Sequence, residues 1–367
     1  MDTDPGSKGN KWQIIFQILQ LLFYLYIFLV SINLMGASLK LFGKGFAESL
    51  IANTSNPLVG LFIGILATSI VQSSSSTTSI VVGMVGGGAL TVSNAIPIVM
   101  GANIGTSVTN TIVALANINR SHEFERSFAA STVHDFFNLL SVLVLFPLQY
   151  FTNYLGLAAG WLGTTFQDVG GMKFFNPAKA ATQPVVDLFV SAGGAYPWVL
   201  FLIAVIFLFL ALRQIVKVLR VLVVKRTEGW FDKILFKTAL RSFFVGLAIT
   251  LMAQSSSITT SLVVPMAGAG ILTLVQIFPY TLGANIGTTI TAILASLVTG
   301  NINAVVVAFA HLLFNISGIM IWWPLSKVPL TLALKLAQLA IRNKMIPFVY
   351  IVIMFFIIPI TVIFLFR

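Results

Sequence analysis

Residues Gly64–Asn117 read GILATSIVQSSSSTTSIVVGMVGGGALTVSNAIPIVMGANIGTSVTNTIVALAN, and the chain repeats this stretch 182 positions later as Gly246–Thr299. The two stretches align without a gap, and 25 of their 54 columns are identical. Both contain Gln-Ser-Ser-Ser, which begins at Gln72 and at Gln254, and both contain Gly-Ala-Asn-Ile-Gly-Thr further on. Such identity within one chain indicates an internal duplication, the pattern of membrane proteins built from two structural repeats.

The composition places the duplicated unit in a membrane. Of the 367 residues 57% are hydrophobic and 8% are charged, whereas about a quarter of the residues of a soluble domain are charged. The mean hydropathy is +0.98. The net charge of +11 comes from basic clusters beside apolar segments, as in cytoplasmic loops, and no nucleic-acid motif is present. The absence of cysteine excludes disulfides and thiolate metal sites.

Basic residues predict how the two units are oriented. The segment between them has the excess of Lys and Arg that is typical of the cytoplasmic side, and its basic residues are Arg213, Lys217, Arg220, Lys225, Arg226, Lys233, Lys237 and Arg241. The long segment 149–196 has only two basic and two acidic residues, which fits the outside. When the spans are traced alternately between these sides, the second unit starts from the side opposite to the first.

Each unit begins with two apolar arms around a polar tip. Each arm has about 13 residues, too few to cross a hydrocarbon core about 30 Å thick, so each pair of arms predicts a re-entrant hairpin. The glycines of Gly-Ala-Asn-Ile-Gly-Thr permit irregular backbone and predict an interrupted span. We expect an all-α integral membrane protein with two inverted-topology repeats, each with a re-entrant helical hairpin and a broken transmembrane helix.

The expected order along the chain is a cytoplasmic tail at 1–11, a transmembrane helix at 12–42, a first repeat at 43–148, an extracellular loop at 149–196, a transmembrane helix at 197–224, a second repeat at 225–323, a cytoplasmic amphipathic segment at 324–345 and a last transmembrane helix at 346–367. The hairpin, broken helix and following helix are expected at 57–88, 91–117 and 127–147 in the first repeat. In the second repeat they are expected at 241–270, 273–299 and 304–323.

The hairpin tips and interruptions suit an anion together with a small cation. A helix N-terminus at a break presents free N–H groups and partial positive charge, which favour an anion. Hydroxyl, amide and freed carbonyl oxygens suit a hard cation such as Na⁺. The hairpins and broken spans contain no Lys or Arg apart from Arg241. An oxyanion bound there needs helix dipoles and a bound cation to offset its charge, which predicts ion coupling.

Asp135 is the only carboxylate in a predicted span between the first span and the central loop, and the aligned position in the second unit is Leu312. A carboxylate at membrane depth is costly and marks a functional site by default. The alternative is a protonated carboxyl group hydrogen-bonded to Asn138 or His134. His134 aligns with His311, at an offset of 177, and two histidines on apolar helices are more often packing residues than ligands.

Enzymatic chemistry is not predicted. Serines in a chain with a His-Asp pair could suggest a hydrolase, but no Gly-x-Ser-x-Gly elbow surrounds them. Three histidines without clustered carboxylates do not suggest a metal enzyme.

The motifs resemble those of the type II sodium–phosphate cotransporter family. The resemblance rests on the paired Gln-Ser-Ser-Ser signatures at Gln72 and Gln254, on GANIGTSVTNT at Gly101–Thr111 and on TVHDFFN at Thr132–Asn138. It implies symport of divalent hydrogen phosphate with Na⁺ as coupling ion and no other cofactor. It also implies electrogenic transport with about three Na⁺ per phosphate, because electrogenic members have aspartate at the position of Asp135. The short outer loop resembles bacterial members, which implies a multi-pass protein of the plasma membrane, here a bacterial inner membrane.

The expected partners are inorganic phosphate, Na⁺ and membrane lipid, without nucleic acid, and the oligomeric state is left open. Phosphate is expected between the two tips, at Gln72, Ser73, Ser74, Ser75, Gln254, Ser255, Ser256 and Ser257. Sodium is expected at Thr68, Asn103, Thr106, Asp135, Asn138, Thr250, Asn285 and Thr288. Rocking of one bundle against a scaffold would give alternating access.

Two alternatives remain open. The same scaffold could carry another oxyanion, such as sulfate or a dicarboxylate, although the lack of a fixed Arg disfavours a dicarboxylate. Broken helices and polar loops at the midplane also occur in channels, so a channel or a passive scaffold is the alternative from a different class.

Overall fold

The structure is a computed structural model that describes residues 6–42, 44–168, 176–224 and 236–366, and all regular structure within these ranges is helical. The elements are α1 (Gly6–Leu41), α2 (Lys44–Asn53), α3 (Pro57–Val71), α4 (Ser74–Gly86), α5 (Val92–Gly105), α6 (Val108–Leu115), α7 (Ser121–Thr152), α8 (Tyr154–Asp168), α10 (Asn176–Gly193), α11 (Pro197–Val224), α12 (Ala239–Ala253), α13 (Ser256–Gly268), α14 (Leu274–Thr299), α15 (Ile302–Trp322), α16 (Lys327–Arg342), α17 (Ile346–Val352), the π-helical turn η2 (Ile353–Ile357) and α18 (Ile358–Phe366).

Helix length and composition describe a multi-pass membrane protein. In the described part of the chain seven segments are long and apolar enough to cross a bilayer, namely Ile15–Leu41, Val92–Leu115, Ser121–Thr152, Pro197–Ile215, Leu274–Thr299, Ile302–Trp322 and Ile346–Phe366. The apolar helices α3 and α12 have only 15 residues each. At 1.5 Å per residue each is about 22 Å long, shorter than the hydrocarbon core of about 30 Å.

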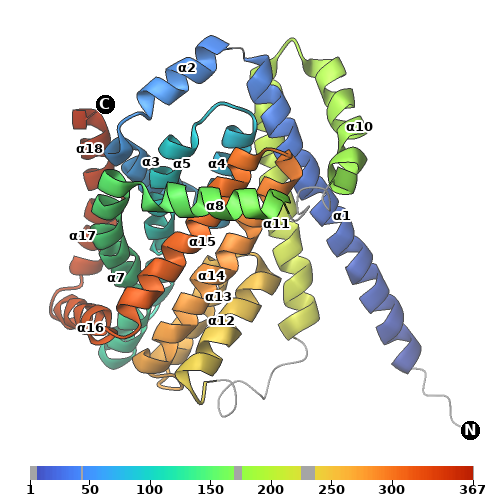
Figure 1. Ribbon diagram of the computed structural model, residues 1–367. Helices are drawn as coiled ribbons and strands as arrows, with labels where there is room; N and C mark the ends of the chain where they lie inside the picture. The colour runs from blue at the N-terminus through green and yellow to red at the C-terminus, as the bar shows by residue number, and fades with distance from the viewer. Residues whose placement is uncertain (1–5, 43, 169–175, 225–235, 367) are drawn as a thin grey trace, which may run out of the picture.

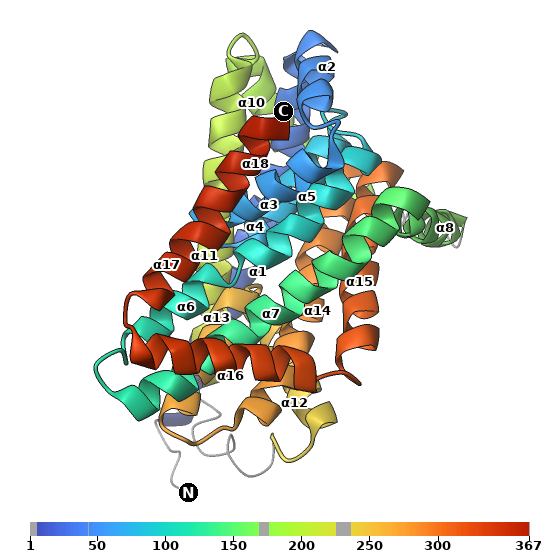
Figure 2. The same ribbon diagram turned by 90° about the vertical axis from the view of Figure 1, so that its left-hand side faces the viewer.

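The helices define two ends of the molecule (Figures 1 and 2). The start of α1, the α6–α7 turn and α16 lie at one end, and α2, α10 and the C-terminus lie at the other. Seven basic residues of the described chain lie in or beside helices at the first of these ends, namely Arg120, Arg126, Arg241, Lys327, Lys335, Arg342 and Lys344, whereas Lys44 of α2 and Lys179 of α10 belong to the other end. Three residues used to predict a cytoplasmic segment, Lys225, Arg226 and Lys233, lie outside the described residues, as do residues 1–5 of the expected tail and Lys173 of the expected loop.

The duplicated sequence forms the same three-helix unit twice, α3–α4–α5 and α12–α13–α14. In each unit the first helix ends at a glutamine in the left-handed region, with φ of 56° at Gln72 and 51° at Gln254. The next residue, Ser73 or Ser255, is extended and caps the second helix. A left-handed residue ends a helix and reverses the chain, so each Gln-Ser pair turns the backbone sharply between two helices.

Glycine allows the first and third helices of each unit to touch backbone to backbone. A Cβ atom on Gly101 would lie 1.9 Å from the Leu61 carbonyl oxygen, and a Cβ atom on Gly283 would lie 1.9 Å from the Phe243 carbonyl oxygen. These glycines and their contacts are equivalent in the two units. Such close approach is the role of small residues at four-residue spacing in membrane helices.

This packing role corrects the prediction of a broken helix in the second repeat. The span expected to break at Gly283–Thr288 is one continuous helix, α14, from Leu274 to Thr299. In the first repeat the helix is interrupted between α5 and α6, at Thr106 and Ser107. Gly287, like Gly283, sits where a side chain would collide, with a Cβ position 2.6 Å from Thr250 Cβ. The glycines therefore serve helix–helix contact, and two glycines alone do not break α14.

Two further segments are more ordered than the sequence predicts. The expected loop at 149–196 contains α8 and α10, and residues 44–53 form α2. Helix α10 is bound to α1 by a hydrogen bond of 2.6 Å from Asn33 Nδ2 to Thr182 Oγ1. Helix α8 packs on α15, where the rings of Phe166 and Phe309 lie 5.9 Å apart. Both helices are held by contacts with distant segments, which local sequence patterns do not reveal.

Candidate functional site

The two Gln-Ser-Ser-Ser tips meet inside the molecule. The Ser257 hydroxyl donates a hydrogen bond of 3.4 Å to the Gln72 carbonyl oxygen, so a residue of one tip touches the other tip. Ser73 Oγ accepts from Ser76 N at 3.2 Å at the start of α4, and Ser255 Oγ accepts from Ile258 N at 3.3 Å at the start of α13. The N-termini of two helices therefore come together, each with partial positive charge.

The serines at these N-termini are shielded from solvent. Ser74 and Ser75 of α4 are buried, and so are Ser256 and Ser257 of α13. Ser73, Gln254 and Ser255 are half-buried, and Gln72 is exposed. Hydroxyl and backbone N–H donors at paired, shielded helix N-termini are suited to bind an oxyanion. The structure thus brings the two tips that contain these eight residues into contact, through Ser257 and Gln72, and their binding of an anion stays a prediction.

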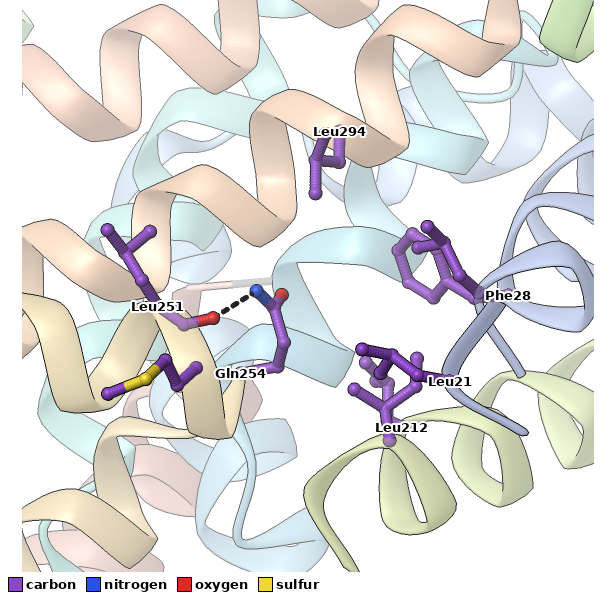
Figure 3. A pocket seen from close by; sticks show the side chains of 9 residues that line it. Leu21, Phe28, Leu212, Leu251, Gln254 and Leu294 are labelled. Atoms are coloured by element: carbon purple, nitrogen blue, oxygen red, sulfur yellow. Dashed lines mark hydrogen bonds between the residues drawn. The ribbon is translucent and has the colours of Figure 1, made fainter. Parts of the chain in front are cut away.

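The Gln254 side chain is held by hydrogen bonds within the second repeat. Gln254 Nε2 donates to the Leu251 carbonyl oxygen at 2.7 Å, and its Oε1 accepts from Thr291 Oγ1 at 2.7 Å. The Gln254 side chain also lines a pocket of about 340 Å³ whose other lining residues are apolar (Figure 3), namely Leu21, Leu25, Phe28, Leu212, Ile215, Leu251, Met252 and Leu294. Gln254 is therefore held by its own repeat.

A buried network of asparagine and histidine joins the two halves of the molecule. His134 Nε2 lies 2.6 Å from Asn285 Oδ1, and the reciprocal pair, His311 Nε2 and Asn103 Oδ1, lies 2.9 Å apart. Because an amide oxygen can only accept, each histidine donates through Nε2. Asn285 Nδ2 donates to Asn138 Oδ1 and Asn103 Nδ2 donates to Asn315 Oδ1, both at 2.9 Å.

This network contains three of the residues expected to bind sodium. Asn103, Asn138 and Asn285 are within 5% of full burial, and Asn138 Nδ2 also donates to the Asn103 carbonyl oxygen at 3.0 Å. Their amide groups are bound to one another and to the histidines. Any ion here would have to share amide oxygens that already accept a hydrogen bond, which a second lone pair on each oxygen permits.

The four threonines expected to bind sodium form two equivalent pairs. Thr106 Oγ1 donates to the Ala102 carbonyl oxygen and Thr288 Oγ1 donates to the Ala284 carbonyl oxygen, both at 3.1 Å. Thr68 and Thr250 are fully buried, and among the described residues their hydroxyls have no hydrogen-bond partner. An unpaired buried hydroxyl is costly, so the hydroxyl oxygens of Thr68 and Thr250 are available to a ligand.

Asp135 makes no hydrogen bond to the asparagine–histidine network within the described residues. Its side chain is fully buried, and its Oδ2 accepts a hydrogen bond of 3.1 Å from Tyr350 Oη of α17. The alternative partners considered for it, Asn138 and His134, are bound within the network instead. Sequence reasoning missed Tyr350 because α17 lies outside the duplicated units. It missed the role of His134 and His311, although their alignment across the repeats was a usable signal.

Comparisons with known proteins add the family context. The family model described as Na⁺/Pi-cotransporter matches residues 27–173 and 206–361. Sodium-dependent phosphate transport protein 2B of Homo sapiens is 33% identical over 98% of this chain and 67% of its own length. Sodium-dependent phosphate transport protein 2A of Rattus norvegicus is 33% identical over 92% of this chain and 65% of its own length. The chain thus spans about two thirds of the length of these relatives, and no solved structure matches significantly.

Proposed function

The chain belongs to the Na⁺/Pi-cotransporter family, and from this we propose that it is a symporter that carries inorganic phosphate across the plasma membrane together with Na⁺. It is a transporter and no enzyme, with Na⁺ as coupling ion and no other cofactor. The resemblance to bacterial members further supports a bacterial inner membrane as its location.

The meeting of the two tips is the observation that carries this proposal. The contact of 3.4 Å between Ser257 Oγ and the Gln72 carbonyl oxygen brings two helix N-termini to one place. Phosphate would be bound by N–H and hydroxyl donors of Gln72–Ser75 and Gln254–Ser257. Within the two hairpins and the spans that follow them, Arg241 is the only Lys or Arg. Since no fixed cation neutralises the anion, co-bound Na⁺ is required, and this requirement couples the two substrates.

Sodium would bind at oxygens around the tips. We propose as ligands the side chains of Thr68, Asn103, Thr106, Asp135, Asn138, Thr250, Asn285 and Thr288. The unpaired hydroxyls of Thr68 and Thr250 support this assignment in both repeats. Both threonines lie in the last turn before a tip, since their carbonyl oxygens accept from the N–H groups of Gln72 and Gln254.

The arrangement of the two units supports inverted repeats with re-entrant hairpins. The α4–α5 turn lies at the end of the molecule that holds α2, and the α13–α14 turn lies at the end that holds α16 (Figures 1 and 2). The short helices α3 and α12 are then the first arms of hairpins that enter from opposite sides. Alternating access would follow if one bundle rocks around the tips.

Asp135 supports electrogenic transport. A carboxylate occurs in one half only, because the equivalent position is Leu312, so one half holds a cation site that the other lacks. About three Na⁺ with one divalent phosphate would move one positive charge inward, and a membrane potential of 100 mV contributes about 2.3 kcal/mol to each such cycle.

Phosphate uptake into proteoliposomes tests the proposal. We expect labelled phosphate to accumulate above its external concentration under an inward Na⁺ gradient and not when choline replaces Na⁺. A Na⁺-independent flux that follows the phosphate gradient would instead indicate a channel. Inhibition of labelled phosphate uptake by unlabelled sulfate or succinate, at the concentration at which unlabelled phosphate inhibits it, would indicate that the protein carries a different oxyanion.

Matched serine variants test the location of the site. Ser75→Ala and Ser257→Ala, equivalent in the two repeats, should raise the phosphate KM about tenfold, as expected for the loss of one hydrogen bond to a charged ligand. The control is Ser191→Ala on α10, an exposed serine whose hydroxyl donates to the Leu188 carbonyl oxygen at 2.9 Å. Equal KM values for all three variants would place phosphate elsewhere.

A further inference from the structure

The last helices reach the buried carboxylate of the first repeat. Tyr350 of α17 donates from its hydroxyl to Asp135 Oδ2 at 3.1 Å. The two residues are 215 positions apart, and α17 belongs to neither duplicated unit. Asp135 is fully buried, and a buried charge requires partners of opposite charge or hydrogen-bond donors. Tyr350 supplies one donor to one of the two carboxylate oxygens.

The other carboxylate oxygen is available. Within the described residues Asp135 Oδ1 is buried without a hydrogen-bond partner, and so is Ser107 Oγ. The Ser107 hydroxyl lies close enough to the Asp135 carboxyl group to interact with it as a weak donor, and Ser107 is at the interruption between α5 and α6. A carboxylate oxygen and a hydroxyl oxygen thus lie together in the buried interior, neither of them held by a well-formed hydrogen bond, and hard cations prefer oxygen ligands of these kinds.

We propose that Tyr350 is a positioning residue for a Na⁺ site formed by Asp135 Oδ1 and Ser107 Oγ. Its hydroxyl fixes Oδ2 and thereby orients the carboxylate so that Oδ1 remains free for the ion. The identity of the ion rests on the proposed function, whereas the role of Tyr350 rests on the contacts of α17. Metal-binding carboxylates are commonly held in this way by a hydrogen bond to the oxygen that does not bind the ion.

The π-helical turn after α17 holds the Tyr350 ring. The rings of Tyr350, in α17, and Phe355, in the π-helical turn, meet edge to face, 5.9 Å apart at 87°. Phe355 is fully buried in an apolar cluster with Ile104 and Val108, which flank the interruption at Thr106 and Ser107. The ring that positions Asp135 is therefore anchored beside the proposed site.

The experiment compares Na⁺ and phosphate dependence in Tyr350→Phe, which removes only the hydroxyl. We expect the Na⁺ concentration for half-maximal uptake to rise about tenfold, the low end of the 10- to 100-fold effect of such supporting contacts. The phosphate KM, measured at saturating Na⁺, should stay within twofold of wild type. Purified protein without phosphate should need about tenfold more Na⁺ to reach the same shift in melting temperature.

Two controls isolate the hydroxyl. Tyr26→Phe removes a hydrogen bond of 3.0 Å to the Ala181 carbonyl oxygen, far from Asp135 in the chain, and should leave Na⁺ dependence unchanged. In an Asp135→Asn background, Tyr350→Phe should have no further effect on Na⁺ dependence, since coupled residues are not additive. Ser107→Ala should weaken Na⁺ binding in the same direction as Tyr350→Phe, which keeps the proposal testable if the tyrosine variant fails to fold.

The outcomes separate the two proposals. An unchanged Na⁺ dependence in Tyr350→Phe, with a lower maximal rate or melting temperature, overturns the positioning role. Additive effects of Tyr350→Phe and Asp135→Asn overturn it as well. If wild-type protein shows a Na⁺-dependent melting shift that Tyr350→Phe weakens, but no Na⁺-driven phosphate uptake, then the proposed function fails and the positioning role stands.

Discussion

His134 Nε2 lies 2.6 Å from Asn285 Oδ1, so a histidine of α7 binds the asparagine at the centre of α14. The same contact occurs in reverse between His311 of α15 and Asn103 of α5. All four side chains are buried. Each half of the molecule thus provides the hydrogen-bond donor for a buried amide oxygen of the other half.

Replacing His134 by alanine should destabilise the protein by about 1–3 kcal/mol, because Asn285 Oδ1 then lacks its donor inside the protein. Thermal unfolding of detergent-purified protein measures the effect. His122→Ala is the control, since His122 is also on α7 but is exposed. Equal melting temperatures for the two variants would show that the network contributes no stability.

Gly101→Ala should separate α3 from α5, because its Cβ atom would lie 1.9 Å from a backbone oxygen that cannot move aside alone. Overpacking of this kind costs about 1–3 kcal/mol, and we expect both a lower melting temperature and less uptake. Gly160→Ala on α8 adds the same methyl group where no atom lies within 4 Å. This control should not lose stability, and an equal loss in both variants would contradict the packing role of Gly101.

Asp135→Gly should retain phosphate uptake but lose its voltage dependence, since the charge that creates the extra cation site is removed. Simultaneous recording of current and labelled phosphate uptake gives the charge moved per phosphate, which should fall towards zero. Glu48→Gln on α2 removes an exposed carboxylate and should leave this ratio unchanged. The same ratio in Asp135→Gly and wild type would remove Asp135 from ion coupling.

The chain contains no cysteine, so a single introduced thiol reports the side on which it lies. Ser55→Cys, after α2, should react with a membrane-impermeant maleimide on intact cells. Asn343→Cys, at the end of α16, should react only after the membrane is made permeable. Both positions are exposed and lie next to helices at opposite ends of the molecule (Figures 1 and 2). Labelling of both from the same side would contradict the predicted orientation.

Local signals in the sequence predicted the helical turns at the tips well. A polar run between two short apolar arms identified the turns at Gln72 and Gln254. Many basic residues belong to segments at one end of the molecule, but Lys44 and Lys179 are in α2 and α10 at the other end. The prediction that α14 is interrupted was wrong because a pair of glycines is compatible with two different structures. Gly283 and Gly287 could loosen the backbone or admit a neighbouring helix, and only the position of α12 decides between them.

Long-range pairing limited the prediction of the site. The sequence identified Asn103, Asn285 and Asp135 as important residues but not their partners, which are 208, 151 and 215 positions away. Alignment of the two repeats suggests which residues play equivalent parts, but not that each pairs across to the other half. Tyr350 has no counterpart in the duplication, so no internal comparison could reveal it.

The reciprocal histidine–asparagine contacts bear on the origin of the chain. In a homodimer of a single ancestral unit, the two contacts would be one contact made twice across a twofold axis, as in any isologous interface. Such a dimer must place the same residue at both symmetric positions. Gene fusion removes this restriction, and it allows aspartate at 135 opposite leucine at 312. A fused protein can therefore have a carboxylate, and any cation site that it forms, in one half only, which a perfectly symmetric dimer cannot.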